Sequence, residues 1–237
     1  MEGNKLTETN QDRDFYNAFA QFRILLSKKF ELQTGLNFNK TQFQLDNIFP
    51  SENASSENYS YDAIWSPQVS FLFKPNNFQT LYISASRGFS LPSIEETLTE
   101  NGTINSNIKP ESGYNFEAGY KGNFEKLRLE LTYFQLLYKN RLGTLAQTDE
   151  NGAFQILRTN IGDSFTKGLE MFAEYYVRIN EKASFSIFSS TSLMEAKYLK
   201  AEVRSGEKNI NIEGNFVEST PQVISRNGLT FRYQKLS

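Results

Sequence analysis

The sequence predicts an all-β fold, an antiparallel sheet of about nine strands that run up and down in turn. Its clearest strand is FELQTGLNFN at residues 30–39, where apolar groups or threonine occupy the even positions and polar groups or glycine the odd ones. A period of two is typical of a strand with one apolar and one wetted face. Short and long connections also alternate along the chain. Together these patterns favour a segment of a transmembrane β-barrel, which has tight turns at one end of its strands and long loops at the other.

The first three strands are predicted over residues 15–26, 30–39 and 65–74, each with alternating apolar and polar positions. The segment 41–63 lies between the second and the third, and its core SENASSENYSYDA is poor in apolar residues. This composition predicts an exposed loop.

The next three strands are predicted over residues 80–87, 113–121 and 127–138. In the first, Leu, Ile and Ala alternate with Tyr and Ser until glycine and proline interrupt the pattern and begin a long loop at 88–112. The third leads into the connection 142–152, whose tip Asp-Glu-Asn-Gly has the residues that a hairpin turn favours.

The last three strands are predicted over residues 154–177, 183–193 and 222–233. Alternation is clearest in LEMFAEYYV, within the first of them. A mixed and charged segment at 195–215 separates the last two strands and is expected to form a long loop.

Connection lengths predict the topology. Short connections are expected at residues 27–29, 75–77, 122–126 and 180–182, and long ones at 41–63, 88–112, 142–152 and 195–215. Strict alternation of this kind is typical of a membrane barrel. The apolar rows also contain no charged residue, which a bilayer would enforce, because Lys or Arg at mid-bilayer on a lipid face costs about 2–4 kcal/mol. A soluble core would exclude charge as well.

Composition excludes several functions. Aromatic residues make up 14% of the chain and charged residues 22%, which suits a sheet with one greasy and one wet face. The net charge of −2 gives no reason to expect nucleic acid. The chain has no Cys and no His, so thiol nucleophiles, histidine bases and the usual zinc or iron–sulfur ligands are excluded. The sequence therefore predicts neither an enzyme nor a bound cofactor.

Four motifs occur in order on the predicted strands. They are SRGFSLP at 86–92, KPESGYNFEAG at 109–119, NIG at 160–162 and GLE at 168–170. Their order and spacing resemble consecutive segments of the barrel of TonB-dependent outer-membrane receptors, and the stretch 216–233 looks like the next descending strand of that family. The resemblance covers roughly residues 65–233.

The resemblance implies a fragment. Receptors of this family have an N-terminal plug domain, a barrel of about 22 strands and a last strand that ends in an aromatic residue. This chain shows about nine strands, no plug domain and the ending Lys235-Leu236-Ser237. Residues 1–237 are therefore expected to be one partial β-barrel domain, from the middle-to-late part of the barrel.

The family resemblance also implies a function. The chain would belong to a receptor in the bacterial outer membrane that takes up a scarce nutrient, with a ferric siderophore or another iron chelate as the expected ligand. The implied partners are outer-membrane lipid, the nutrient chelate, and TonB through a plug domain that this chain lacks; no nucleic acid is implied.

Six residues in the predicted loops or in the chain next to them are candidate contacts, because a cationic or aromatic group at a barrel mouth suits an anionic chelate. They are Tyr59, Tyr61, Arg87, Asn105, Arg141 and Arg158. The tyrosines could instead serve loop packing, and Arg87 and Arg158 could contact the lumen or lipopolysaccharide. Four carboxylates on the polar rows are expected to form salt bridges with the wall, namely Glu117, Glu130, Glu170 and Glu174.

Two other hypotheses remain open. A soluble or surface-attached β-sandwich binding module, such as a lectin or adhesin domain, would pair the apolar rows face to face in a two-sheet core. An outer-membrane barrel enzyme would need a Ser/Lys or carboxylate constellation, for which the spacing gives no support.

Overall fold

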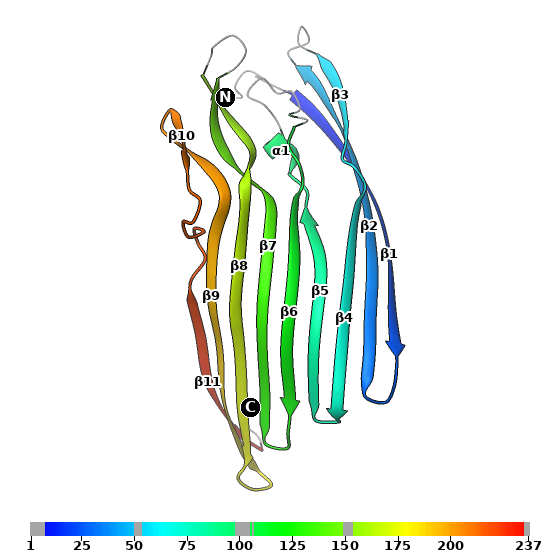
Figure 1. The fold of residues 1–237 in the computed structure, drawn as a ribbon, viewed down its shortest axis with the longest axis vertical. Helices are drawn as coiled ribbons and strands as arrows, with labels where there is room; N and C mark the ends of the chain where they lie inside the picture. The colour runs from blue at the N-terminus through cyan, green and yellow to red at the C-terminus, as the bar shows by residue number, and fades with distance from the viewer. Residues whose placement is uncertain (1–7, 50–53, 98–104, 106, 149–153, 235–237) are drawn as a thin grey trace.

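The fold is almost entirely strand. The computed structural model describes residues 8–49, 54–97, 105, 107–148 and 154–234. The strands are β1 (Glu8–Leu25), β2 (Phe30–Phe49), β3 (Ser55–Ser60), β4 (Ile64–Asn76), β5 (Gln79–Ser90), β6 (Glu111–Asn123), β7 (Leu127–Thr148), β8 (Phe154–Arg178), β9 (Ala183–Ser205), β10 (Lys208–Asn211) and β11 (Val223–Tyr233). One helical turn, α1 (Ile94–Thr97), lies between β5 and β6 (Figure 1).

All described strands form one antiparallel sheet (Figure 1). The order along the wall is β1-β2-β4-β5-β6-β7-β8-β9; β3 also pairs with β2, and both β10 and β11 pair with β9. Within the described residues β1 and β11 do not pair with each other, so the sheet is open. Every predicted strand has its counterpart, and the prediction of an antiparallel up-and-down β-barrel segment is confirmed.

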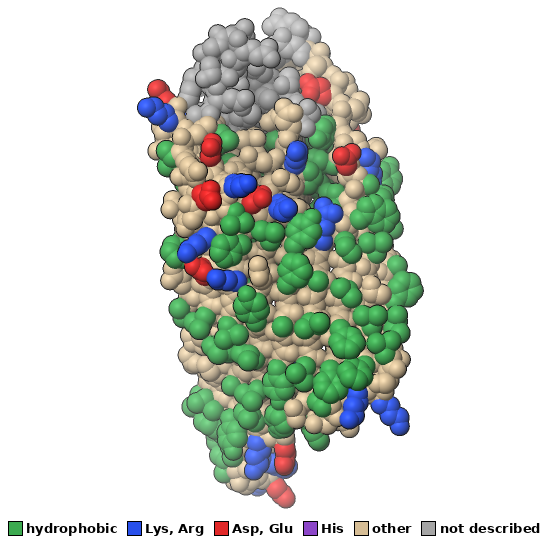
Figure 2. All heavy atoms as spheres, viewed as in Figure 1, with side chains coloured by type: hydrophobic (Ala, Val, Ile, Leu, Met, Phe, Trp, Pro, Cys, Tyr) green, Lys and Arg blue, Asp and Glu red, His purple; other side chains and the backbone are tan. Residues whose placement is uncertain are grey.

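One face of the sheet is apolar from edge to edge (Figure 2). The register aligns one residue from each wall strand in a single rung, Ile24–Leu32–Phe71–Ile83–Ala118–Tyr133–Leu169–Leu193–Val223. The one sheet formed by the described strands leaves this rung uncovered, since Ile83 is 59% exposed and Tyr133 47%. The sandwich hypothesis is therefore wrong for the described residues, because it requires two apolar faces packed together.

The opposite face is polar, and its side chains reach across strands. Tyr82 Oη of β5 and Thr132 Oγ1 of β7 are hydrogen-bonded at 2.9 Å, over the intervening strand β6. Gly119 of β6 makes this possible, because a Cβ there would lie 2.4 Å from the Tyr82 ring. The last glycine of the KPESGYNFEAG motif thus permits a close side-chain approach.

The carboxylates of the polar face differ in their partners. Glu130 pairs with Arg128 at 2.6 Å and with Lys121 at 3.9 Å, as predicted. The other three have no cation within ion-pair distance in the part of the chain that the structure describes: Glu117, Glu170 and Glu174. The salt-bridge prediction is wrong for them. Glu117 and Glu170 face hydroxyl and aromatic side chains, not cations, on the adjacent strands.

Three of the four predicted loops are mostly sheet. β2 continues beyond residue 41 and pairs with β3, β9 continues into a hairpin with β10, and β7 and β8 lengthen towards a tip at 149–153 that lies outside the described residues. Polar composition does not end a strand, because the ladder needs only backbone hydrogen bonds. In the fourth segment, 88–112, β5 extends to Ser90 and α1 follows.

The segment 41–63 is also not exposed throughout. Thr41, Phe43 and Leu45 of β2 are 0%, 4% and 1% exposed. These residues lie on the polar face, where Leu91 of the β5–β6 connection packs against Phe43. The prediction of an exposed loop is wrong here, because the cover comes from a segment distant in sequence.

The tight turns lie at the end of the sheet opposite to β3 and β10, at the bottom of Figure 1. In the β1–β2 turn, Ser27 Oγ accepts hydrogen bonds from the backbone N–H groups of Lys29 (3.1 Å) and Phe30 (3.2 Å). The hydroxyl thus adds to the backbone hydrogen bonds of the turn, in which the N–H groups of Leu26 and Ser27 donate to Phe30 O.

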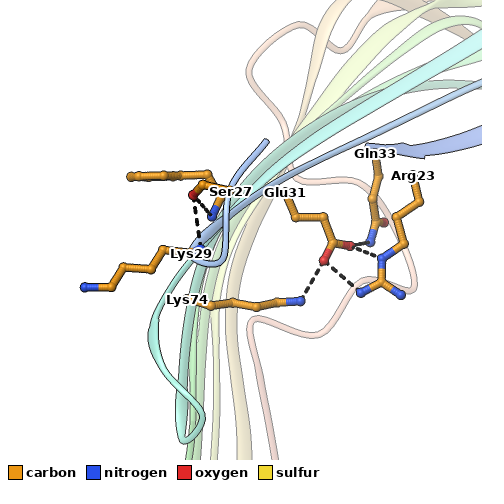
Figure 3. Close-up of polar contacts among 7 residues, drawn as sticks. Arg23, Ser27, Lys29, Glu31, Gln33 and Lys74 are labelled. Carbon is orange, nitrogen blue, oxygen red and sulfur yellow. Dashed lines mark hydrogen bonds and ion pairs between the residues drawn. The ribbon is translucent and has the colours of Figure 1, made fainter. Parts of the chain in front are cut away.

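Next to this turn, four residues form what we call the turn-end cluster: Arg23, Glu31, Gln33 and Lys74 (Figure 3). The Glu31 side chain is 3% exposed and accepts hydrogen bonds from Arg23 and Lys74 at 2.7 Å each and from Gln33 at 2.6 Å. Its two oxygens therefore accept four hydrogen bonds from three side chains, and the cluster ties β1, β2 and β4 together.

Candidate ligand site at the loop end of the sheet

The wall opens between β4 and β5 towards the loop end. The β4–β5 ladder stops at the pair Gln68–Ser86, whereas β4 stays paired with β2 and β5 stays paired with β6 beyond this point. Across the opening, Arg87 Nη1 donates a hydrogen bond to the backbone oxygen of Trp65 at 3.1 Å. A side chain thus replaces the backbone ladder as the link between these two strands.

A pocket of about 460 Å³ lies at this opening and is the candidate site. Tyr59 and Tyr61 line it from β3 and the β3–β4 connection, and Arg87 lines it from β5. Lys109, just before β6, and Asn140 of β7 complete the opposite side. Three of the six predicted contact residues therefore meet in one pocket.

An aromatic cluster forms one wall of the pocket. Phe43 and Tyr59 are cross-strand partners on β2 and β3 with ring centroids 5.3 Å apart, and Tyr61 lies 5.9 Å from the first and 5.0 Å from the second. Tilted ring pairs of this kind stabilise an arrangement beyond the area they bury. Since Leu91 also packs on Phe43 and Tyr61, the rings are fixed before any ligand arrives.

Tyr61 keeps an unused hydroxyl in this buried position. The residue is 2% exposed, and burial, with a smaller contribution from Tyr59, raises the pKa of Tyr61 to about 12. The phenol is therefore protonated at neutral pH. Its Oη is buried and has no hydrogen-bond partner among the described residues. An unpartnered buried polar group costs about 1–3 kcal/mol, which a ligand oxygen would relieve.

Three nitrogen atoms of this region are also buried and unpartnered in the described structure: Arg13 Nε, Arg87 Nε and Asn105 Nδ2. The charge of Arg13 lowers the pKa of Tyr61 against the effect of burial. Asn105 is 8% exposed, and its Oδ1 accepts a hydrogen bond at 3.1 Å from the backbone N–H of Asn107, which lines the pocket. Because the unused groups are mostly donors, the chemistry of the region suits a ligand rich in oxygen acceptors.

The β5–β6 connection crosses the polar face beside the pocket. Pro92 O accepts a hydrogen bond from Arg13 of β1 at 3.4 Å, and Glu96 of α1 pairs with Arg158 of β8 at 2.8 Å. On a flat sheet β1 and β8, six places apart in the order, would lie about 29 Å apart. The sheet therefore curves around this connection, with the polar face inside.

Arg158 is held by α1 and does not line the pocket. Ser93 and Glu96 cap the helical turn reciprocally: Glu96 accepts the Ser93 N–H at 3.0 Å, and Ser93 Oγ accepts the Glu96 N–H at 3.2 Å. The Ser93 N–H first, and Arg158 second, hold the pKa of Glu96 below its ordinary value. Arg158 thus anchors the crossing segment in this structure.

Arg141 lies in a separate cluster on β7 to β9. Its Nη1 donates to Ser164 Oγ at 3.1 Å, and its guanidinium carbon lies 5.5 Å from the ring centroid of Tyr138 and 5.8 Å from that of Tyr198. Tyr198 Oη donates to Glu218 at 2.6 Å, and burial, followed by this carboxylate, raises the pKa of Tyr198 to about 12. The structure does not bring Arg141 to the pocket.

The NIG motif holds two of the segments that line the pocket. Asn160 Nδ2 donates to the backbone oxygens of Lys109 at 2.9 Å and Asn140 at 2.7 Å, and Asn160 Oδ1 accepts the Lys109 N–H at 2.8 Å. Gly162, at φ 141°, sits in the bulge where the β8–β9 register shifts. The motif therefore clips together two pocket-lining segments, a role that the sequence pattern does not reveal.

Other features of the described residues do not compete with this site. No described helix is long and apolar enough to cross a membrane, and no cluster of three or more acidic side chains suitable for a metal ion occurs among the described residues. A hollow of about 530 Å³, lined by Arg178, Arg232 and Tyr233 among others, lies by the edge strand β11 at the turn end.

Comparisons with known proteins agree on one family. The model of the family "TonB dependent receptor-like, beta-barrel" matches residues 3–236, whereas no curated protein matches the chain. One similar solved structure is the copper transporter OprC, with 18% sequence identity and a TM-score of 0.66 over 91% of this chain and 32% of that one. The ferric yersiniabactin uptake receptor FyuA from Yersinia pestis has 14% identity and a TM-score of 0.64 over 94% of this chain and 32% of its own. The ferric citrate transporter FecA has 17% identity and a TM-score of 0.67 over 94% of this chain and 31% of its own. At these identities the likeness shows the fold alone. The chain spans about a third of the length of each of these structures.

Proposed function

Because this chain belongs to the TonB-dependent receptor family, we propose that it forms part of the barrel wall of a nutrient receptor in the bacterial outer membrane. The family consists of outer-membrane receptors and transporters, not enzymes, that bind small-molecule nutrient chelates and interact with TonB. The proposal treats residues 1–237 as one partial barrel domain. The plug domain and the contact with TonB are proposed for the whole receptor.

The observation that carries this proposal is the contrast between the two faces of the sheet. One apolar rung crosses all wall strands and is exposed, whereas the polar face curves around the β5–β6 connection. An exposed apolar band of this extent needs an apolar phase to cover it, which the hydrocarbon of a bilayer provides.

We further propose that the pocket at the loop end receives the nutrient, a metal chelate that presents carboxylate, phenolate or other oxygen acceptors. Support comes from the unused donors Tyr61 Oη, Arg87 Nε and Asn105 Nδ2, and from Tyr59, whose ring lies beside them. Arg141 and Arg158 remain candidates, although a ligand there would compete with Ser164 and Glu96.

An iron chelate such as a ferric siderophore is the finer proposal. Two of the similar structures are named for ferric chelates and one for copper, so these names do not select the cargo. The donor-rich pocket supports an anionic, oxygen-rich ligand of either metal.

The test is equilibrium binding to the receptor that contains this chain, purified in detergent, with a panel of ferric and cupric chelates of carboxylates, catecholates and hydroxamates. We expect at least one oxygen-rich chelate to bind, and Arg87→Gln to weaken it. Arg232→Gln, which removes the same charge at the opposite end of the sheet, is the matched control. The proposal fails if no chelate binds, or if both variants bind as the unmodified receptor does.

A further inference from the structure

A proline of β4, Pro67, lies where the β4–β5 ladder stops and the two strands diverge (Figure 1). The N–H of Lys74 donates to Lys29 O of β2, so the even-numbered residues of β4 direct their N–H groups to β2 and the odd-numbered ones to β5. Pro67 is odd-numbered and has no N–H. The missing donor therefore falls at the next hydrogen-bonded pair of the ladder, which would join Pro67 to Arg87.

The opening reaches the apolar face of the sheet. Phe89 of β5 alternates onto the same face as Ile83. On β4, Trp65 is 50% exposed, and its ring centroid lies 4.8 Å from that of its cross-strand partner Phe38 on β2. The next residue in the row of Phe38 is Lys40, so the apolar row of β2 ends there. The opening therefore lies at the loop-end border of the apolar band, beside aromatic side chains.

The candidate pocket has lining residues from both faces of the sheet. Tyr59 is the cross-strand partner of Phe43 and shares its position on the polar face, whereas Arg87 and Phe89 belong to the apolar row of β5. The guanidinium carbon of Arg87 lies 5.7 Å from the ring centroid of Tyr114, its neighbour in the same rung on β6. Because the ladder is absent at this point, the cavity extends between β4 and β5 from the polar face to the apolar face.

The two sides of this passage differ in chemistry. Towards the polar face lie the unused donors Tyr61 Oη and Asn105 Nδ2. Towards the apolar face, Trp65 and Phe89 offer uncharged aromatic surface. Arg87 lies between them, with Nη1 on Trp65 O at 3.1 Å and Nε buried without a partner in the described structure. A ligand that fits both sides has a polar head and an apolar tail.

We propose that the receptor takes up amphiphilic chelates, whose head group binds in the pocket while an acyl tail passes between β4 and β5 to the apolar face beside Trp65 and Phe89. This inference rests on the proposed function of the pocket. A tail in this position leaves water for the hydrocarbon that covers the apolar band, whereas a tail on the polar face would stay in contact with water. Pro67 keeps the passage open, because a ladder closed there would leave the backbone oxygen of Arg87 without its donor.

The test is equilibrium binding to the receptor that contains this chain, in lipid nanodiscs. The probes are ferric and cupric chelates of carboxylates, catecholates and hydroxamates, each prepared with and without a dodecanoyl chain. For a head group that binds, we expect the acylated form to bind at least as tightly as the form without the chain. Pro67→Ala restores the missing N–H and lets the ladder extend, so it should weaken the acylated form by about tenfold and leave the other form unchanged. Pro75→Ala, at the turn end of the same strand, is the matched control and should change neither.

A photoreactive diazirine at the tip of the chain locates the tail, and we expect cross-links to Trp65 or Phe89. Cross-links to Phe43 or Tyr59, or to none of these four residues, would overturn the inference. It would also be overturned if the unmodified receptor bound the acylated form about tenfold more weakly than the form without the chain, or if Pro67→Ala bound both forms as the unmodified receptor does. Binding of the form without the chain alone refutes this inference, whereas absence of binding by every probe refutes the proposed function.

Discussion

The two ends of the sheet differ in whether their buried polar groups are hydrogen-bonded. At the turn end, the Glu31 side chain is 3% exposed and its carboxylate accepts four hydrogen bonds from three side chains (Figure 3). At the loop end, Tyr61 Oη, Arg87 Nε and Asn105 Nδ2 are buried without partners in the described structure. Satisfied buried groups contribute stability, whereas unsatisfied ones cost stability and retain binding capacity. This difference supports the proposal that the turn end stabilises the wall and that the loop end binds the ligand.

The strongest way to break this comparison is Glu31→Leu. The change leaves Arg23 and Lys74 facing each other without a carboxylate, so we expect the largest loss of thermal stability among these variants, seen as a fall in Tm of the receptor in detergent. Chelate affinity should not change. Weaker chelate binding with an unchanged Tm would contradict the comparison, because it would assign ligand binding to the turn end.

Arg87→Gln should have the opposite effect. Loss of a charged donor in the pocket is expected to weaken the chelate by about 10–100-fold, measured by titration calorimetry, with little change in Tm because the residue makes one hydrogen bond across the opening. Arg87→Lys should recover only part of the affinity, since ammonium lacks the planar fork of guanidinium. Full recovery with Lys would mean that charge alone matters.

Tyr61→Phe sharpens the comparison further. The variant keeps the ring in its cluster and deletes an unpartnered hydroxyl, so the empty receptor should become slightly more stable while the chelate binds about 3–10-fold more weakly. Differential scanning calorimetry and binding on the same preparation provide both numbers. A loss of stability would show that the hydroxyl already has a structural role.

The smallest expected effect concerns pH at the Glu96–Arg158 anchor. The pKa of Glu96 is below its ordinary value in the folded chain, so its contribution to stability is fully present above the unfolded pKa and disappears as pH falls through the folded one. Both side chains are about one-third exposed, so the effect should stay below about 1 kcal/mol. Glu96→Gln should remove this part of the acid dependence of Tm, and an unchanged acid profile would assign the dependence to other carboxylates.

The sequence predicts the strands of the wall better than it predicts the structure at the loop end. Period-two alternation predicts each wall strand, because one face must meet an apolar phase and the other must not. It does not predict that β2 continues through Phe43 and Leu45, because the surrounding composition is that of a loop and because the apolar residues there move from the even to the odd positions, which lie on the polar face. The period of two persists there with the apolar positions on the other face, and the long-range cover of that face explains the change.

The contact candidates show the same limit. Tyr59, Tyr61 and Arg87 share the pocket because β3 with its connection to β4 and the loop end of β5 meet where the β4–β5 ladder has stopped. Arg158 pairs with Glu96, 62 positions earlier, and Arg13 reaches Pro92, 79 positions later. Contacts of this range depend on how the β5–β6 connection crosses the sheet, and no local pattern records that path.

The central assignment, a barrel wall with its apolar face in lipid and its polar face in the lumen, can be measured directly because the chain has no Cys. Single cysteines at Ile83 and Leu193 on the apolar face, and at Ser84 and Ser192 on the polar face, would carry spin labels in intact outer membranes. The predicted result is collision with dissolved oxygen but not with a polar nickel chelate at 83 and 193, and the reverse at 84 and 192. Equal polar accessibility at all four positions, or occlusion of 83 and 193 from both reagents, would contradict the barrel wall.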